Sequence, residues 1–385
     1  MGLDCDPDLD AVEGELIAWA RHLGTPCYLY RRKPIRERLA QLREALGCLG
    51  CGARLLYAMK ANRHPDVLAC VRADGTVGID ASSPREVALA LAAGFDAAEI
   101  SVTAGMLSDR DLASFVRAGV HLNLDTLSAI RRYGAIAPAG TGIGLRLDPG
   151  PLAGWGGNPR LAYGGGKFGL AEAAVPAAVE ACRAAGLAID TLHIHCGWNL
   201  QRAALPAFER ALAMLARLAG DLGVATINVG GGLGIRFRPD DDPLPIEDWA
   251  AALARHLAPL GRTVACEPGT FVVAEAGVLV AEVNTVEQRG PTTWIGVDCG
   301  HNVNVYAAHY GIPLRIALLG ARPGGLRRYA VAGNINEAND VFAVDVPLPE
   351  VREGDLLAFV PAGAYGSSMA SDHCLRGWPA EAMIG

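Results

Sequence analysis

A single lysine follows a short apolar run near the start of the chain. Lys60 comes directly after residues 54–59, whose apolar side chains indicate a buried strand. In an apolar setting the pKa of an ammonium falls, and the neutral amine can form a Schiff base with an aldehyde. A lysine that simply reaches solvent from a strand end is the commoner case. Lys60 therefore needs support from elsewhere in the sequence.

Three further features of the sequence could bind a phosphorylated ring compound next to the Lys60 amine. Backbone N–H groups of the glycine loop 230–234 can surround a phosphate dianion, because glycine lets the backbone approach closely. Glu267 can accept a hydrogen bond from a protonated ring nitrogen, and His195 can stack on a ring face. Together with Lys60 they predict a site for pyridoxal 5′-phosphate, whose ring is an electron sink for carbanion chemistry.

The elements that must position these residues recur at regular intervals. Short apolar runs alternate with Ala/Leu-rich stretches of helical period, such as residues 84–93 and 109–118. Eight strands that alternate with helices predict an α/β fold, a (β/α)8 TIM barrel. The eight predicted strands cover residues 54–59, 76–80, 99–103, 120–125, 142–147, 191–195, 226–229 and 263–267.

Polar residues stand at the ends of the predicted strands. In a barrel of this kind the loops after the strands meet on one face, where the chemistry takes place. His193 is expected to be structural, with a side chain that points away from the face that presents His195. The residues placed at strand ends are Lys60, Asp80, Arg146, His195, the glycine loop and Glu267.

The order of the motifs resembles that of a known family. The motifs lie at residues 57–62, 193–197, 230–234, 267–269, 297–302, 336–340 and 363–371. In that order they are similar to the pyridoxal-phosphate decarboxylases of the alanine-racemase fold (fold type III), above all the diaminopimelate, ornithine and arginine decarboxylases.

This resemblance implies two domains. The first is a cofactor-binding barrel over residues 34–275, and the second is a β-rich, sandwich-like or barrel-like domain formed by residues 1–33 and 276–385. The sequence agrees with the second domain, since strand character recurs at residues 277–286, 293–298, 327–332 and 355–360. The resemblance also implies a homodimer in which the two chains share their active sites.

Site residues follow from the resemblance by position. The catalytic set is Lys60, His195, Glu267, Asn336 and Glu337. The cofactor-binding set is Lys60, Asp80, Arg146, His195, Gly231, Gly232, Gly234, Glu267, Gly269, Thr270 and Tyr365. The substrate-binding set is Tyr306, Tyr310, Glu337 and Asp340, and no metal ion is expected.

Four departures from the family pattern concern the substrate side. Asn336 stands where relatives usually carry the Cys that protonates the carbanion, and Trp198 stands where they have Ser. Thr270 and residues 306–310 lack two arginines that normally grip the distal carboxylate of diaminopimelate, a geometry that a hydroxyl cannot reproduce. Diaminopimelate is therefore not expected as the substrate.

The resulting hypothesis is a decarboxylase of a non-standard amino acid or a carrier-bound aminoacyl group, in siderophore-like or other specialised biosynthesis. Transaldimination would transfer the cofactor from Lys60 to the amino group of the substrate, and Glu267 would keep the cofactor ring electron-poor. Three alternatives stay open: a racemase or epimerase of the same fold, a catalytically altered homologue that binds a partner, and a cofactor-free Schiff-base aldolase.

Composition limits the partners and the compartment. The 385 residues carry a net charge of −7 and offer no basic face, so nucleic acid is not an expected partner. No run of about 18 apolar residues spans a bilayer, and the first residues do not resemble a secretion signal. The ten cysteines are scattered, and Cys48 and Cys51 form the single close pair. A cytoplasmic enzyme with a small-molecule substrate is expected.

Overall fold

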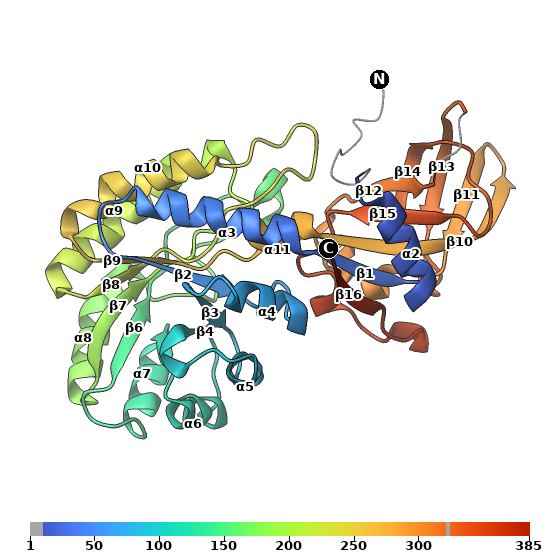
Figure 1. Ribbon diagram of the computed structural model, residues 1–385. Coiled ribbons are helices and arrows are strands. Elements are labelled where there is room, and N and C mark those ends of the chain that lie inside the picture. Colours follow the sequence, from blue (N-terminus) through green and yellow to red (C-terminus); the bar gives the residue numbers. More distant parts are fainter. Residues whose placement is uncertain (1–10, 321–323) are drawn as a thin grey trace. The chain divides into compact units, whose positions relative to one another are not determined.

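Two compact units make up the chain in this computed structural model, which describes residues 11–320 and 324–385 (Figure 1). Residues 1–10, which the sequence assigns to the β-rich domain, lie outside the described residues. The barrel unit consists of Arg36–Arg236 and Asp240–Val272. The β-rich unit consists of the chain up to Ile35, Phe237–Pro239 and Val273–Gly385.

The barrel unit contains a closed barrel of eight parallel strands, as the sequence predicts. Each strand pairs with the next in chain order, and β9 closes the ring by pairing with β2. Strand side chains are mostly buried, which matches the apolar runs from which they were predicted. The strands are β2 (Ala53–Ala58), β3 (Val77–Ala81), β4 (Ile100–Thr103), β5 (His121–Leu124), β6 (Gly142–Arg146), β7 (Ala188–His193), β8 (Thr226–Asn228) and β9 (Thr263–Cys266).

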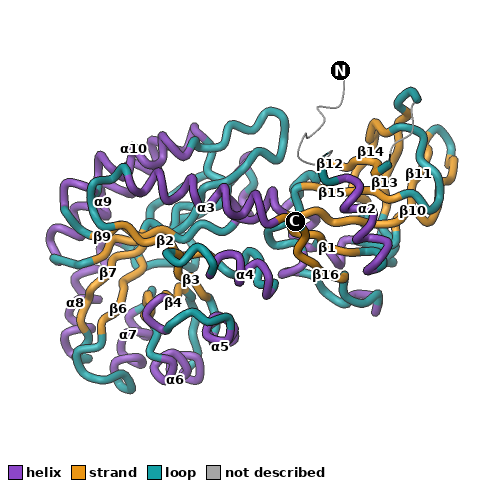
Figure 2. Tube along the Cα trace, viewed as in Figure 1, coloured by secondary structure: helices purple, strands orange, loops and turns teal. Residues whose placement is uncertain are grey.

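Helices alternate with the strands of the barrel and lie outside them (Figures 1 and 2). Their starts are encoded locally: Ser83 accepts a hydrogen bond from the Glu86 N–H ahead of Pro84, and Ser108 forms a capping box with Asp111. The helices are α3 (Arg32–Gly47), α4 (Pro65–Arg72), α5 (Pro84–Ala92), α6 (Asp109–Ala118), α7 (Leu127–Gly134), α8 (Val175–Ala184), α9 (Leu205–Leu222), α10 (Ile246–His256) and α11 (Thr270–Val273).

The β-rich unit is built on one mixed sheet. Its strands run in the order β12-β15-β10-β11-β13-β14, and β1 pairs with β10 antiparallel and with β16 parallel. The strands are β1 (Cys27–Arg31), β10 (Gly277–Arg289), β11 (Thr292–Val297), β12 (Arg315–Leu319), β13 (Arg327–Ala332), β14 (Val341–Leu348), β15 (Leu356–Val360) and β16 (Ala380–Ile384).

A small apolar core holds this sheet together. Helix α2 (Glu13–Leu23) contributes Leu16 and Ala20, which pack with buried side chains of β1, β10 and β15. Helix α12 (Val305–Tyr310) belongs to the same unit. No helix within the described residues is long and apolar enough to cross a membrane. The predicted fold class, a (β/α)8 barrel with a β-rich domain, is confirmed.

Candidate active site

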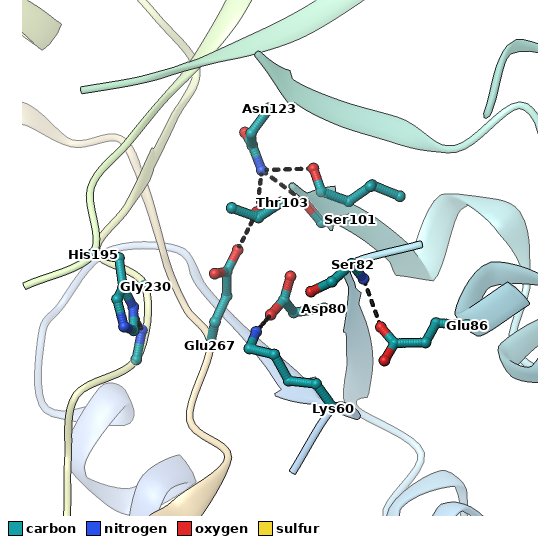
Figure 3. Close-up of polar contacts among 12 residues, drawn as sticks. Lys60, Asp80, Ser82, Glu86, Ser101, Thr103, Asn123, His195, Gly230 and Glu267 are labelled. Carbon is teal, nitrogen blue, oxygen red and sulfur yellow. Dashed lines mark hydrogen bonds and ion pairs between the residues drawn. The ribbon is translucent and has the colours of Figure 1, made fainter. Parts of the chain in front are cut away.

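Lys60 lies two residues beyond the end of β2 and forms an ion pair with Asp80 of β3 (Figure 3). The distance from Lys60 Nζ to Asp80 Oδ2 is 2.5 Å, and the Lys60 side chain is 39% exposed whereas that of Asp80 is fully buried. Burial, followed by the nearby charge of Glu267, raises the pKa of Asp80 to about 8 although Lys60 opposes the shift. The lysine is thus held at the strand end by a buried carboxyl group whose pKa is raised above its usual range.

Glu267 follows β9 and receives hydrogen bonds on both of its oxygens. Asn228 Nδ2 donates to Oε1 at 2.7 Å, Thr103 Oγ1 donates to the same oxygen at 3.2 Å, and His193 Nε2 lies 3.0 Å from Oε2. Burial alone would raise the pKa of Glu267, but the interaction with His193, the charge of Lys60 and the Asn228 hydrogen bond outweigh it and hold the pKa below its usual value. The side chain is therefore a buried, ionised carboxylate.

A chain of polar contacts continues from Glu267 across the barrel (Figure 3). Asn123 of β5 is fully buried and donates to Thr103 Oγ1 at 2.9 Å and to Ser101 Oγ at 3.1 Å. Because the Asn123 amide fixes Thr103, the Thr103 hydroxyl is left to donate to Glu267. Side chains of the neighbouring strands β4 and β5 thus help to orient this carboxylate.

His195 lies beyond the end of β7 and is held by the glycine loop. The Gly231 N–H donates to His195 Nδ1 at 3.2 Å, and the ring of Tyr163 meets the imidazole edge-on with centroids 5.0 Å apart. Burial, followed by the positive charges of Arg146 and Lys60, lowers the pKa of His195 to about 3. His195 is thus neutral and carries its proton on Nε2.

The glycine loop presents backbone donors at the end of β8. Gly230 and Gly232 have φ angles of +67° and +117°, a region that favours glycine. Asn199 Oδ1 accepts the Ile235 N–H, and a Cβ at Gly234 would lie 1.6 Å from the same oxygen. Within the described residues, the N–H groups of residues 232–234 have no acceptor. Three backbone donors are thus available for an anion.

Two residues that depart from the family pattern contact each other. Trp198 donates its Nε1–H to Thr270 Oγ1 at 2.9 Å, and the ring of Trp155 packs edge-on against Trp198 with centroids 5.6 Å apart. Thr270 begins α11 directly after Gly269, whose Cα faces Ala58 and Ala61 so closely that an added Cβ would crowd them. Arg146 ends β6, with its guanidinium 4.4 Å from the centre of the Phe168 ring.

The remaining predicted residues lie in the β-rich unit. Tyr306 is buried and contacts both Tyr310 and Tyr365, with ring centroids 5.6 Å and 5.0 Å apart. Tyr365 has a φ angle of +60°, which is strained for a residue with a side chain. The three tyrosines that the sequence singles out therefore form one cluster.

The loop that carries Asn336 is shaped by Asp340. Asp340 is buried and accepts the backbone N–H groups of His301 at 2.7 Å and Ile335 at 2.9 Å. Asn336 and Glu337 are exposed, and Glu337 Oε1 lies 3.2 Å from His373 Nε2. Asp340 thus fixes the loop, and a substrate contact for it stays a prediction.

With this geometry established, comparisons with known proteins identify the chain. Residues 32–274 match the family described as "Pyridoxal-dependent decarboxylase, pyridoxal binding domain". This chain belongs to that family of decarboxylases. The resemblance inferred from the motifs is confirmed, and the decarboxylase is a pyridoxal-phosphate-dependent carboxy-lyase.

Similar proteins cover almost the whole chain. A diaminopimelate decarboxylase of Methanothermobacter thermautotrophicus is 35% identical over 97% of this chain and 89% of its own length. One from Streptomyces coelicolor is 32% identical over 95% of this chain and 86% of its own. The crystal structure of Helicobacter pylori diaminopimelate decarboxylase complexed with L-lysine superposes with a TM-score of 0.88 at 26% identity, covering 97% of this chain and 94% of that one.

These relatives overturn the expectation of a specialised substrate other than diaminopimelate, which is wrong. That expectation depended on the absence of arginine at Thr270 and in residues 306–310. Its physical weakness is that the loss of two arginines removes one way to bind a carboxylate and leaves other cations of the chain available.

Sequence reasoning missed the residues that surround Glu267. The expectation for His193 is wrong, because its ring lies in the barrel and contacts Glu267, whereas Asn228 and Thr103 were not considered. A signal was present: Thr103, His193 and Asn228 are the last residues of β4, β7 and β8, and each is polar. Residues at i and i+2 also share a face of a strand, so His193 and His195 should have been expected together.

The residues of the barrel unit fit pyridoxal 5′-phosphate. The cofactor has an aldehyde, a basic ring nitrogen and a phosphate, and the unit offers an amine at Lys60, an ionised carboxylate at Glu267 and the unengaged N–H groups of residues 232–234. Each chemical group of the cofactor therefore has a complementary group on the same side of the barrel, at or after the strand ends.

Proposed function

We propose that this decarboxylase acts on diaminopimelate. Removal of one Cα carboxylate and its replacement by a proton converts diaminopimelate to lysine and carbon dioxide. The observation that carries the proposal is the near-full-length similarity to diaminopimelate decarboxylases, at 35% identity for the relative from Methanothermobacter thermautotrophicus. A free amino acid also makes delivery by a carrier protein unnecessary.

Lys60 would bind the aldehyde group of the cofactor, and Glu267 would bind its ring nitrogen. When bound, pyridoxal 5′-phosphate supplies an electron sink for the charge left by the departing carboxylate. Glu267, kept ionised by its three hydrogen-bond donors, would keep a proton on the ring nitrogen. The N–H groups of residues 232–234 would bind the phosphate, and His195, neutral and oriented by Gly231, would lie against the ring.

The proton that replaces carbon dioxide needs a donor. Asn336 cannot supply it, because an amide is not acidic enough. We assign this role to Lys60 Nζ, which is hydrogen-bonded to Asp80. Burial raises the pKa of Asp80, which supports this assignment because a carboxyl group of raised pKa can share a proton with the amine.

The distal carboxylate of diaminopimelate needs a cation. Arg376 lines an open hollow of about 490 Å³ in the β-rich unit, together with Asn334 and Asn336. Its Nη2 donates to the Asn334 carbonyl at 2.6 Å, which orients the guanidinium. We assign the distal carboxylate to Arg376, and Arg376→Gln is expected to raise KM about tenfold or more while cofactor binding is unchanged.

We further propose a homodimer with shared active sites, in which Tyr306, Tyr310, Glu337 and Tyr365 contribute to the site that contains Lys60. The family resemblance supports this assembly. We place the enzyme in the cytoplasm, since every cysteine among the described residues is a free thiol, as a reducing compartment favours.

The test uses the purified protein loaded with pyridoxal 5′-phosphate and supplied with diaminopimelate. We expect equal amounts of carbon dioxide and lysine, and neither product from the Lys60→Ala variant. Carbon dioxide from ornithine or arginine but not from diaminopimelate would show that the substrate assignment is wrong. An altered configuration at Cα without carbon dioxide would instead identify a racemase.

A further inference from the structure

His193 is a fully buried titratable residue that neither the catalytic nor the cofactor-binding set includes. It is the last residue of β7, and its side chain has no exposed surface. The ring nitrogen Nε2 lies 3.0 Å from Glu267 Oε2. The other nitrogen, Nδ1, is buried and has no hydrogen-bond partner among the described residues.

This geometry determines the tautomer of His193. Glu267 is an acceptor, so the proton must lie on Nε2 for a hydrogen bond to form. A proton on Nδ1 would instead have no acceptor and would leave the Nε2 lone pair facing a carboxylate. Burial lowers the pKa of His193 in spite of the opposing charge of Glu267, so the ring is neutral and donates a single hydrogen bond.

The three donors to Glu267 divide its two oxygens unequally. Oε1 accepts from both Asn228 and Thr103, whereas His193 is the donor to Oε2. Each carboxylate oxygen has two acceptor positions, so Oε2 keeps one for a further donor. Because His193 is rigidly buried in a strand, its Nε2–H fixes the plane of the carboxylate and thus the direction of that remaining position.

We propose that His193 is a positioning residue that acts through Glu267, orienting and keeping ionised the carboxylate that holds a proton on the cofactor's ring nitrogen. The inference rests on the proposed role of Glu267 and not on the identity of the substrate. A buried, unpaired Nδ1 is a stability defect in a purely structural histidine, and it is explained if the Nε2–H is what the position requires.

The test compares three variants of the loaded protein. His193→Gln keeps an N–H donor near the position of Nε2, whereas His193→Leu removes the donor. His121→Gln is the matched control, because His121 Nε2 lies 2.8 Å from Asp190 Oδ1 in a second histidine–carboxylate pair, at the start of β5. The readout is the ¹⁵N NMR signal of ring-labelled pyridoxal phosphate bound to each protein, which reports the protonation of the ring nitrogen without substrate.

We expect a protonated ring nitrogen in the wild type, His193→Gln and His121→Gln, and loss of that proton in His193→Leu within the range of neutral pH. The kcat of His193→Leu should fall roughly 10- to 100-fold with little change in KM, as when the outer partner of a metal ligand is removed. Borohydride reduction should still attach the cofactor to Lys60. If His193→Leu does not fold, His193→Asn replaces it, since its shorter side chain keeps an amide that does not reach Glu267.

An unchanged ring-nitrogen signal in the folded donor-less variant would overturn the proposal, and so would loss of the proton in His193→Gln. Both results are independent of turnover. If the wild type releases no carbon dioxide from diaminopimelate but the ring-nitrogen signals behave as expected, the substrate assignment fails and the role of His193 stands.

Discussion

Trp198 and Thr270, from the segments that follow β7 and β9, are joined by a hydrogen bond of 2.9 Å from the indole N–H to the hydroxyl oxygen. Both residues occupy positions at which the sequence departs from the family pattern, where Ser and Arg are usual. The indole nitrogen can only donate a hydrogen bond, so the hydroxyl oxygen of the buried Thr270 must be the acceptor. The two departures from the family pattern are therefore in direct contact.

A double-mutant cycle tests this coupling. Trp198→Phe and Thr270→Val should each lower the free energy of unfolding by about 1 kcal/mol, and the double variant should lose less than their sum, because only one hydrogen bond is removed. Urea denaturation measures each value, and Thr270→Ser, which keeps the hydroxyl, is the control. Strict additivity would show that the two positions are independent.

Lys60 should be the residue that binds the cofactor covalently. In Lys60→Arg the charge that pairs with Asp80 is kept, but a guanidinium does not condense with an aldehyde, so decarboxylation should be abolished in a folded protein. Mass spectrometry after borohydride treatment should find the cofactor on the peptide that contains Lys60 in the wild type and on no peptide of the variant. Labelling of another lysine in the wild type would refute the assignment.

The strands of the barrel were predictable because their apolar runs are short and regularly spaced. The sixth strand was predicted over residues 191–195, whereas β7 spans Ala188–His193. Its first residues were missed because the charged Asp190 interrupts the apolar pattern at the start of the strand. Strands β12, β14 and β16 were not predicted, and for the last two a physical reason can be named. Asp345 in β14 has a φ angle of +60°, and β16 is a strand because β1 lies beside it, a partner distant in sequence.

The residues of the active site likewise fall into a group that the sequence predicted and a group that it did not. Lys60, Asp80 and Glu267 were found from strand ends, since the barrel topology alone brings such ends together. The hydrogen bonds to Glu267 depend on which side chains face each other across the barrel, and strand register sets this. The substrate prediction was wrong because the absence of arginine at two positions does not reveal which other cation of the chain binds the carboxylate.

Acid should destabilise the cofactor-free protein through His195. Burial, followed by the charges of Arg146 and Lys60, lowers the pKa of His195 from its ordinary 6.5 to about 3. Between these values the unfolded chain binds the proton and the folded chain does not, so stability rises with pH across this window and is lost as pH falls. His195→Phe removes this contribution, because phenylalanine does not titrate.

The measurement is the free energy of unfolding in urea at pH 7 and pH 5 for the wild type and His195→Phe. Relative to the variant, the wild type should lose about 2 kcal/mol between the two pH values, at about 1.4 kcal/mol per pH unit below 6.5. All other titrating groups are common to both proteins and cancel to first order. An equal loss in both proteins would mean that His195 is protonated in the folded state.

The glycine loop should not tolerate a side chain at Gly234. A Cβ there would lie 1.6 Å from Asn199 Oδ1, which accepts the Ile235 N–H at 2.8 Å and is fully buried. Gly234→Ala must displace Asn199 or the loop, so we expect a loss of about 1–3 kcal/mol in stability and weaker binding of inorganic phosphate to the cofactor-free protein.

Gly220→Ala is the control, because Gly220 lies in α9 with no atom near its would-be Cβ, and there alanine should stabilise the helix by about 0.5–1 kcal/mol. Thermal unfolding and phosphate titration of both variants decide the matter: equal behaviour of the two would show that Asn199 does not constrain the loop.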